Sequence, residues 1–179
     1  MKRCLGLGAL LLASIVAAAP IDATRSSVTF AGRQMGVPIE GLFRRVSGDL
    51  DWNAAHPEQS KAQVEVDLAS IDLGEPEFNA ELQRRTFFDT TTFPKATFTS
   101  VSMKPLGGGR FEVAGRLAIK GVSRDVVAPV TVRDEGGQRI FETAFPLRRL
   151  DYKIGEGEWS DSAALANEVQ VRVRLVTAR

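Results

Sequence analysis

The sequence predicts an all-β protein in which about eight antiparallel strands close into a barrel. Apolar and polar residues alternate with a period of two in nearly every segment, which is the pattern of a strand with one buried face. Short turns rich in glycine join most of these segments, as in antiparallel hairpins. Closing the strands into a barrel removes the exposed edges that an open sheet would leave.

The expected strands follow one another along the chain with few interruptions. The second is the longest, and Gly48 lies where a bulge or bend would form in it. The last, rich in valine, has the clearest alternation in the sequence. We expect strands at residues 27–30, 42–52, 62–69, 96–103, 111–119, 126–132, 140–147 and 168–175.

One helix is expected in the middle of the chain, over residues 75–85. Pro76 suits its first turn, and Glu77 suits the positive end of its dipole. Phe78 and Leu82 are four residues apart and form a narrow apolar stripe. A helix with so narrow a stripe covers a surface rather than being enclosed, and we expect it to cap one end of the barrel.

The first residues have the pattern of a secretory signal peptide. A basic start is followed by an apolar run over residues 5–16 and then by small residues, and the run is too short to span a bilayer. We expect cleavage after Ala18, which would leave residues 19–179 as a single periplasmic or secreted domain. The only cysteine, Cys4, would leave with the signal peptide, so the domain would depend on its core rather than on disulfides.

No set of residues typical of catalysis stands out. His56 is the only histidine, and without a second histidine or a further cysteine no ordinary zinc or copper site can be assembled. The sequence contains neither a Gly-x-Ser-x-Gly elbow nor a phosphate-binding glycine loop. We therefore expect no metal, no cofactor and no enzymatic activity, although paired carboxylates acting on a hydrophobic substrate stay open as an alternative. With 23 basic and 22 acidic residues, nothing indicates a nucleic-acid partner.

Four of the ten phenylalanines lie close together, between the expected helix and the strand that follows it. They are Phe87, Phe88, Phe93 and Phe98. Removing each ring from water is worth about 1.5–3 kcal/mol, so the rings must be buried. They either fill a core or line the mouth of a cavity, and the sequence alone leaves both interpretations open.

A second unusual segment, residues 148–159, precedes the last strand. It contains the only tyrosine, Tyr152, together with Trp159 and an Arg149-x-Asp151 pair. In the structural interpretation, which we favour, the Arg–Asp pair ties a wide loop to the barrel while Tyr152 and Trp159 pack as lids. In the functional interpretation, Arg149 and Tyr152 donate hydrogen bonds to a ligand head group.

Several blocks of sequence occur in an order and spacing that resemble a known family. They are Val28-Thr29-Phe30; Gly41-Leu42-Phe43 with Val46-Ser47-Gly48; Phe87-Phe88-Asp89 with Phe93-Pro94; Gly115-x-Leu117-x-Ile119-x-Gly121-Val122-Ser123-Arg124; and Arg149-x-Asp151-Tyr152-x-Ile154-Gly155. Together they resemble the YceI-like family of bacterial secreted lipid- and polyisoprenoid-binding proteins. Where that family usually has glycine after the aromatic residue, this chain has Lys153.

The resemblance implies a lipocalin-like barrel whose apolar lumen holds an isoprenoid or fatty-acyl-type lipid for sequestration or transport, without catalysis. It also implies a periplasmic protein that is not stably inserted in a membrane and that can form a homodimer. A barrel filled by side chains, in a structural or stress-response role, is the alternative. The candidate ligand-binding residues of lumen and mouth are Phe30, Phe43, Val66, Leu68, Phe78, Leu82, Phe87, Phe88, Phe93, Phe98, Leu117, Ile119, Phe145, Arg149, Tyr152 and Trp159.

Overall fold

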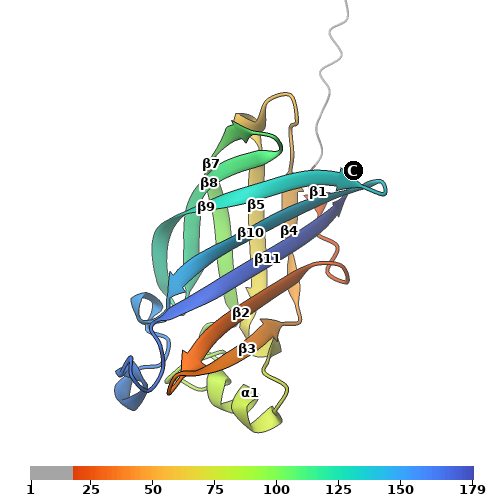
Figure 1. Ribbon diagram of the computed structural model, residues 1–179. Helices are drawn as coiled ribbons and strands as arrows, with labels where there is room; N and C mark the ends of the chain where they lie inside the picture. Colours follow the sequence, from red (N-terminus) through yellow and green to blue (C-terminus); the bar gives the residue numbers. More distant parts are fainter. Residues whose placement is uncertain (1–17) are drawn as a thin grey trace, which may run out of the picture.

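In the part of the chain that the structure describes, eleven β-strands form one antiparallel sheet that curls into a barrel, with helix α1 (Pro76–Gln83) at one end (Figure 1). The computed structural model describes residues 18–179, so the expected signal peptide lies outside the described residues except for Ala18. The predicted class, an antiparallel all-β barrel with one α-helix at its end, is confirmed for the described part of the chain. No helix in residues 18–179 is long and apolar enough to cross a membrane.

The strands alternate with short turns for most of the chain, as the glycine-rich connections indicated. Four short 3-10 helices and α1 interrupt this pattern. The strands are β1 (Ala19–Pro20), β2 (Ser27–Gln34), β3 (Val37–Phe43), β4 (Val46–Asp51), β5 (Lys61–Asp67), β6 (Ile71–Asp72), β7 (Lys95–Gly107), β8 (Arg110–Ile119), β9 (Val122–Glu135), β10 (Gln138–Arg148) and β11 (Glu168–Ala178). They lie in the order β1-β4-β5-β7-β8-β9-β10-β11-β2-β3-β6.

The prediction of one strand over residues 42–52 is wrong, because this segment contains the end of β3 and the whole of β4. The two strands pair with different neighbours, β3 with β2 and β4 with β5, and Arg44 and Arg45 lie between them. The chain from β3 to β4 thus joins opposite regions of the sheet and closes the barrel. The strand count exceeds the expected eight for this reason and because the structure adds β1 and β6. Each of these contains only two residues, too few to show an alternating pattern in the sequence.

Gly48 occupies the position in β4 where the sequence indicated a bend. Its backbone has φ +133°, and a Cβ atom there would overlap the carbonyl group of Gln63 on β5. The amide of Ile21 donates a hydrogen bond of 2.9 Å to the Gly48 carbonyl, and Ile21 also bridges to Thr177 of β11. Glycine therefore lets the N-terminal segment and β5 approach β4 closely at this end of the barrel.

Strands β9 and β10 are paired over only part of their length. Gln138 pairs with Glu135 at one end of the ladder, and Thr143 pairs with Val130 at the other. Beyond Thr143 the described chain has no further pairing between the two strands. From there β9 pairs with β8 alone and β10 with β11 alone (Figure 1). The barrel wall is therefore least continuous beyond Thr143.

The buried core consists of two clusters. One includes Phe111 and Phe141 with Trp52 packed against it, and the other includes Leu68 and Phe87. Many other inward-facing side chains are only half-buried, which indicates that the interior of the barrel is not filled. They include Phe30, Val64, Phe98, Leu117, Val130, Phe145 and Val171.

Candidate ligand-binding site

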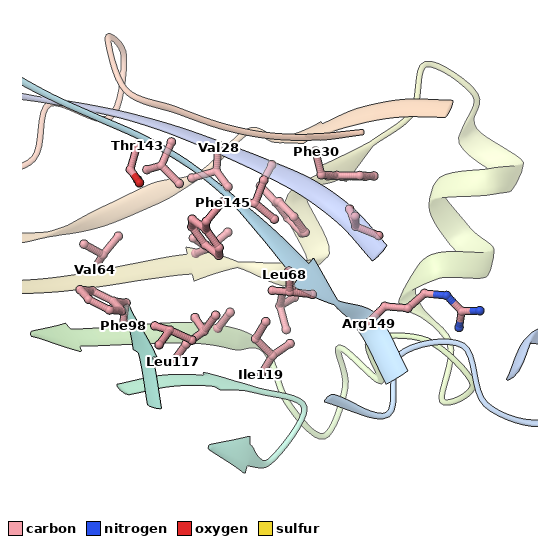
Figure 2. A pocket seen from close by; sticks show the side chains of 18 of the residues that line it. Val28, Phe30, Val64, Leu68, Phe98, Leu117, Ile119, Thr143, Phe145 and Arg149 are labelled. Carbon is pink, nitrogen blue, oxygen red and sulfur yellow. The ribbon is translucent and has the colours of Figure 1, made fainter. Parts of the chain in front are cut away.

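A cavity of about 480 Å³ occupies the interior of the barrel. This volume falls within the range of small-molecule sites, and it is roughly three times that of an engineered apolar cavity that binds benzene. Aliphatic and aromatic side chains from strands around the whole barrel line it (Figure 2). The half-buried phenylalanines therefore line a cavity and do not fill a core.

Helix α1 lies where the cavity reaches the surface. Phe78, Glu81 and Leu82 of the helix line the cavity, yet no residue of α1 is buried and Phe78 is 62% exposed. The predicted apolar stripe of Phe78 and Leu82 thus faces the mouth. Leu82 packs against the core cluster of Leu68 and Phe87, and polar contacts at the start of the helix add to this packing.

Those polar contacts come from Asn79 and Asp72. The Asn79 side chain accepts a hydrogen bond from the Leu73 amide (2.7 Å) and donates one to Asp72 (3.0 Å). Asp72 also accepts from the Gly74 amide (2.8 Å) and pairs with Arg44 at the end of β3. These bonds hold the pKa of the Asp72 carboxyl below its ordinary value of 3.8, the Gly74 amide having the largest effect.

A group of three rings packs across the opposite end of the cavity. The Trp52 ring meets Phe111 at 4.9 Å and Phe141 at 5.6 Å between centroids, both nearly edge-to-face. The guanidinium of Arg139 lies 5.8 Å from the centre of a Trp52 ring. Edge-to-face pairs of this kind stabilise a defined geometry, so the three packed rings close this end of the cavity.

Most of the residues that the sequence predicted as ligand contacts come together in this cavity. The exceptions are Phe93 and Tyr152, which do not line it. Whether the lining residues contact a ligand stays a prediction. The predicted residues that line the cavity are Phe30, Phe43, Val66, Leu68, Phe78, Leu82, Phe87, Phe88, Phe98, Leu117, Ile119, Phe145, Arg149 and Trp159.

Phe93 and Tyr152 lie outside the cavity, Phe93 in the loop before β7 and Tyr152 in the 3-10 helix after β10. The Phe93 ring packs against Gly121, where a Cβ atom would come within 2.8 Å of it. Tyr152 is only 3% exposed and belongs to the core cluster around Leu68 and Phe87. Burial raises the pKa of Tyr152 above its ordinary value of 10.0, so its phenol stays neutral. Neither side chain is positioned to hold a head group in the cavity.

Arg149 lines the cavity but binds the protein's own backbone. Its Nε donates to Ala166 O (3.0 Å), its Nη1 to the carbonyls of Ile154 (2.8 Å) and Gly155 (3.0 Å), and its Nη2 to those of Trp159 (2.5 Å) and Leu165 (2.6 Å). A guanidinium has five N–H groups, so all are engaged. Figure 2 shows the guanidinium directed away from the phenylalanines and valines of the lumen. This geometry supports the structural interpretation of Arg149.

The expected Arg149–Asp151 pair is not formed, and in the described chain Arg149 has no carboxylate partner within ion-pair distance. Burial alone lowers the pKa of Arg149 below its ordinary value. The Asp151 backbone carbonyl instead accepts a hydrogen bond of 2.8 Å from Arg124. Lys153 adopts a left-handed conformation with φ +57°, which glycine adopts at less cost than lysine does.

Several lining residues escaped the sequence-based prediction. Trp52, Met103 and Thr143 line the cavity, as do Val126, Ala128 and Val130 of β9. Their positions follow from the same alternation that predicted the strands. The alternation could have identified them, but it could not distinguish a lumen from a filled core.

The described residues contain no group of three or more His, Cys, Asp or Glu side chains arranged to hold a metal ion. His56 is exposed in the turn before β5, where its Nδ1 lies 3.3 Å from Glu58. The charged side chains that line the cavity are Asp51, Lys61, Glu81 and Arg149, and they belong to its wall at the ends of strands or in α1 and the loops.

Comparison with known proteins finds relatives that share one description. A protein described as a UPF0312 protein from Shewanella baltica is 32% identical over 136 residues, which cover 73% of this chain and 71% of that protein. One of the same description from Pseudomonas putida is 33% identical over 139 residues, covering 74% of this chain and 72% of that protein.

Solved structures share the fold. BcnA from Burkholderia cenocepacia aligns with a TM-score of 0.85 at 37% identity, over 88% of this chain and 99% of that one. A polyisoprenoid binding domain from Saccharophagus degradans aligns with a TM-score of 0.73 at 22% identity, over 91% and 100%, a likeness that concerns the fold alone. The sequence profile described as the YceI-like domain matches residues 20–177. The chain therefore belongs to the YceI-like family.

Proposed function

We propose that this protein binds a long-chain, isoprenoid-type lipid inside its barrel and sequesters or carries it in the periplasm. The single observation that carries the proposal is the continuous apolar cavity of about 480 Å³ between α1 and Trp52. Each CH₂ group that enters such a cavity from water gains about 0.8 kcal/mol. The polyisoprenoid-binding description of the Saccharophagus degradans domain, which has the same fold, agrees with this ligand class.

The periplasmic location rests on the signal-peptide pattern of the first residues. A bilayer offers a lipid the same gain in burial as the barrel does, so preference for the protein must come from the shape of the cavity and its few polar groups. A barrel filled by side chains would leave no such volume, and the cavity therefore weighs against a purely structural role. A homodimer is compatible with this function but is not required by it.

Native mass spectrometry of protein purified from its own host tests the proposal. We expect a co-purified lipid, and displacement of an apolar fluorescent probe by farnesol. Ala128→Phe adds a ring at an inward position of β9, whereas Val127→Phe adds one at the exposed neighbour. The first variant should lose the lipid and the second should keep it. Absence of lipid and of probe binding in the unmodified protein would refute the function.

A further inference from the structure

Thr143 interrupts an otherwise apolar row of inward-facing side chains on β10. The neighbours in this row are Phe141, Phe145 and Leu147, all of which line the cavity. Across the strands, Thr143 pairs with Val130 of β9 and with Val173 of β11. A lone hydroxyl is therefore placed among valines and phenylalanines (Figure 2).

The Thr143 hydroxyl has no hydrogen-bond partner. Its oxygen is buried, and it is the one buried side-chain N or O atom of the described residues that lacks a partner. Burying a hydroxyl without a partner costs about 1–3 kcal/mol. Valine has the same shape and a comparable preference for strands, so neither packing nor strand formation requires threonine here.

A resident water is a poor partner for this hydroxyl. A buried water makes about three hydrogen bonds, which requires several polar groups around it. The side chains that pair with Thr143 on both neighbouring strands are valines, and Val28 continues the same row on β2. The cavity wall therefore supplies no second polar side chain in this row to hold a water.

The hydroxyl can be turned toward the cavity by a single rotation. The Thr143 side chain borders the cavity, while its oxygen is covered by neighbouring atoms in the ligand-free protein. Rotation about the Cα–Cβ bond moves the hydroxyl to another staggered position, while the methyl group or the hydrogen atom takes the place that it leaves. A ligand that offers a hydrogen bond would favour the rotamer that satisfies the hydroxyl.

We propose that Thr143 recognises a neutral oxygen atom, a hydroxyl or a carbonyl, carried by the lipid deep inside the barrel. The inference rests on the proposed function and names its ligand class more closely. Thr143 lies six residues before Arg149, which directly follows β10, so it is roughly 20 Å from the loop end of the cavity at the rise of an extended strand. A charged group at this depth would be left unpaired among valines, at a prohibitive cost, so the oxygen must be neutral.

Matched probes measure this preference. Delipidated protein is titrated with stearate, with ketostearates and with hydroxystearates that differ in the position of the oxygen, each displacing a fluorescent naphthylamine. We expect one or more of the oxygenated chains to bind about three- to tenfold more tightly than stearate, which corresponds to one neutral hydrogen bond. Thr143→Val should abolish this preference, and Thr143→Ser should retain it. Thr131→Val, the same change on the exposed face of β9, should leave it intact.

Thermal unfolding of the ligand-free protein gives an independent readout. Thr143→Val should raise Tm by about 2–4 °C, because it removes an unsatisfied hydroxyl. Equal affinities of wild type for stearate and for every oxygenated chain, or a Thr143→Val variant that keeps the preference, would overturn the inference while leaving lipid binding intact. A Tm that falls on this substitution would also overturn it. Failure of all these chains, and of farnesol, to bind wild type would overturn the proposed function as well.

Discussion

The ring of Phe98 lies against Gly115 of the neighbouring strand, so closely that a Cβ atom at Gly115 would overlap it. Phe98 is on β7 and Gly115 on β8, two register positions apart. The ring of Phe30 on β2 lies equally close to Gly41 of β3, which is its direct register partner. In both cases a glycine in the wall makes room for a large ring beside it. The rings therefore lie along the wall, and the lumen stays open.

This relationship predicts the effect of Gly115→Ala. The added methyl group must displace the Phe98 ring and also meets the Thr99 carbonyl at 2.6 Å. We expect a loss of about 1–3 kcal/mol in the free energy of unfolding and weaker lipid binding. Gly32→Ala is the matched control, because Gly32 of β2 lines the cavity but a Cβ atom there meets nothing closer than 3.7 Å. Chemical denaturation and probe titration measure both effects; equal behaviour of the two variants would contradict the expectation.

Phe87 and Phe88 are adjacent in sequence but differ in burial, and we expect different consequences of removing them. Phe87 is 4% exposed and packs with Trp159 at 5.6 Å, so Phe87→Ala should cost about 3–5 kcal/mol of stability. Phe88 is half-buried at the cavity, with its ring edge-on to Phe43 at 5.7 Å.

Phe88→Ala should therefore cost less, about 1–2 kcal/mol, and should release bound lipid severalfold faster. Unfolding curves and stopped-flow displacement of the probe separate the two effects. If Phe88→Ala lost as much stability as Phe87→Ala without any change in release, Phe88 would be part of the core rather than of the lumen.

Arg149→Ala should destabilise the protein without a specific effect on ligand choice. The substitution leaves five backbone carbonyls without their donor, and we expect a loss of about 3 kcal/mol or more. Arg149→Lys keeps the charge but supplies at most three N–H donors, so it should recover only part of the loss. Arg148→Ala, at an exposed neighbour, is the control. An Arg149→Lys variant of full stability that prefers a different head group would instead favour the functional interpretation.

The polar contacts of α1 should weaken in acid. The folded-state pKa of Asp72 lies below its ordinary 3.8, so its contribution to stability is present above about pH 4 and is lost as the pH falls through the folded-state value. Asp22 and Asp134 are shifted in the same direction, so the difference between wild type and Asp72→Asn is the informative quantity.

We expect the Asp72→Asn variant to have a shallower decline in unfolding free energy between about pH 4 and pH 2 than wild type. Denaturation curves at several pH values measure it. Parallel curves for the two proteins would show that the Asp72 carboxyl contributes nothing through its ionisation.

The sequence by itself determined most of the strands, the helix and the apolar face of each predicted strand, because alternation with a period of two and helical spacing are local properties. It located Phe30, Phe98, Leu117 and Phe145 on that inward face. It misplaced the break at Arg44–Arg45, because that break depends on which neighbours β3 and β4 find in the sheet.

Only the tertiary structure decided whether the phenylalanines fill the barrel or line it, since the answer depends on distances between strands far apart in the chain. The glycines opposite Phe30 and Phe98 are visible in the sequence, but their pairing with those rings is set by strand register. In the same way, assembly of the loops and strands brings five carbonyls around Arg149 and leaves the Thr143 hydroxyl without a partner. The hydrophobic period specifies which side chains share a face of a strand, and tertiary packing specifies which groups each side chain contacts.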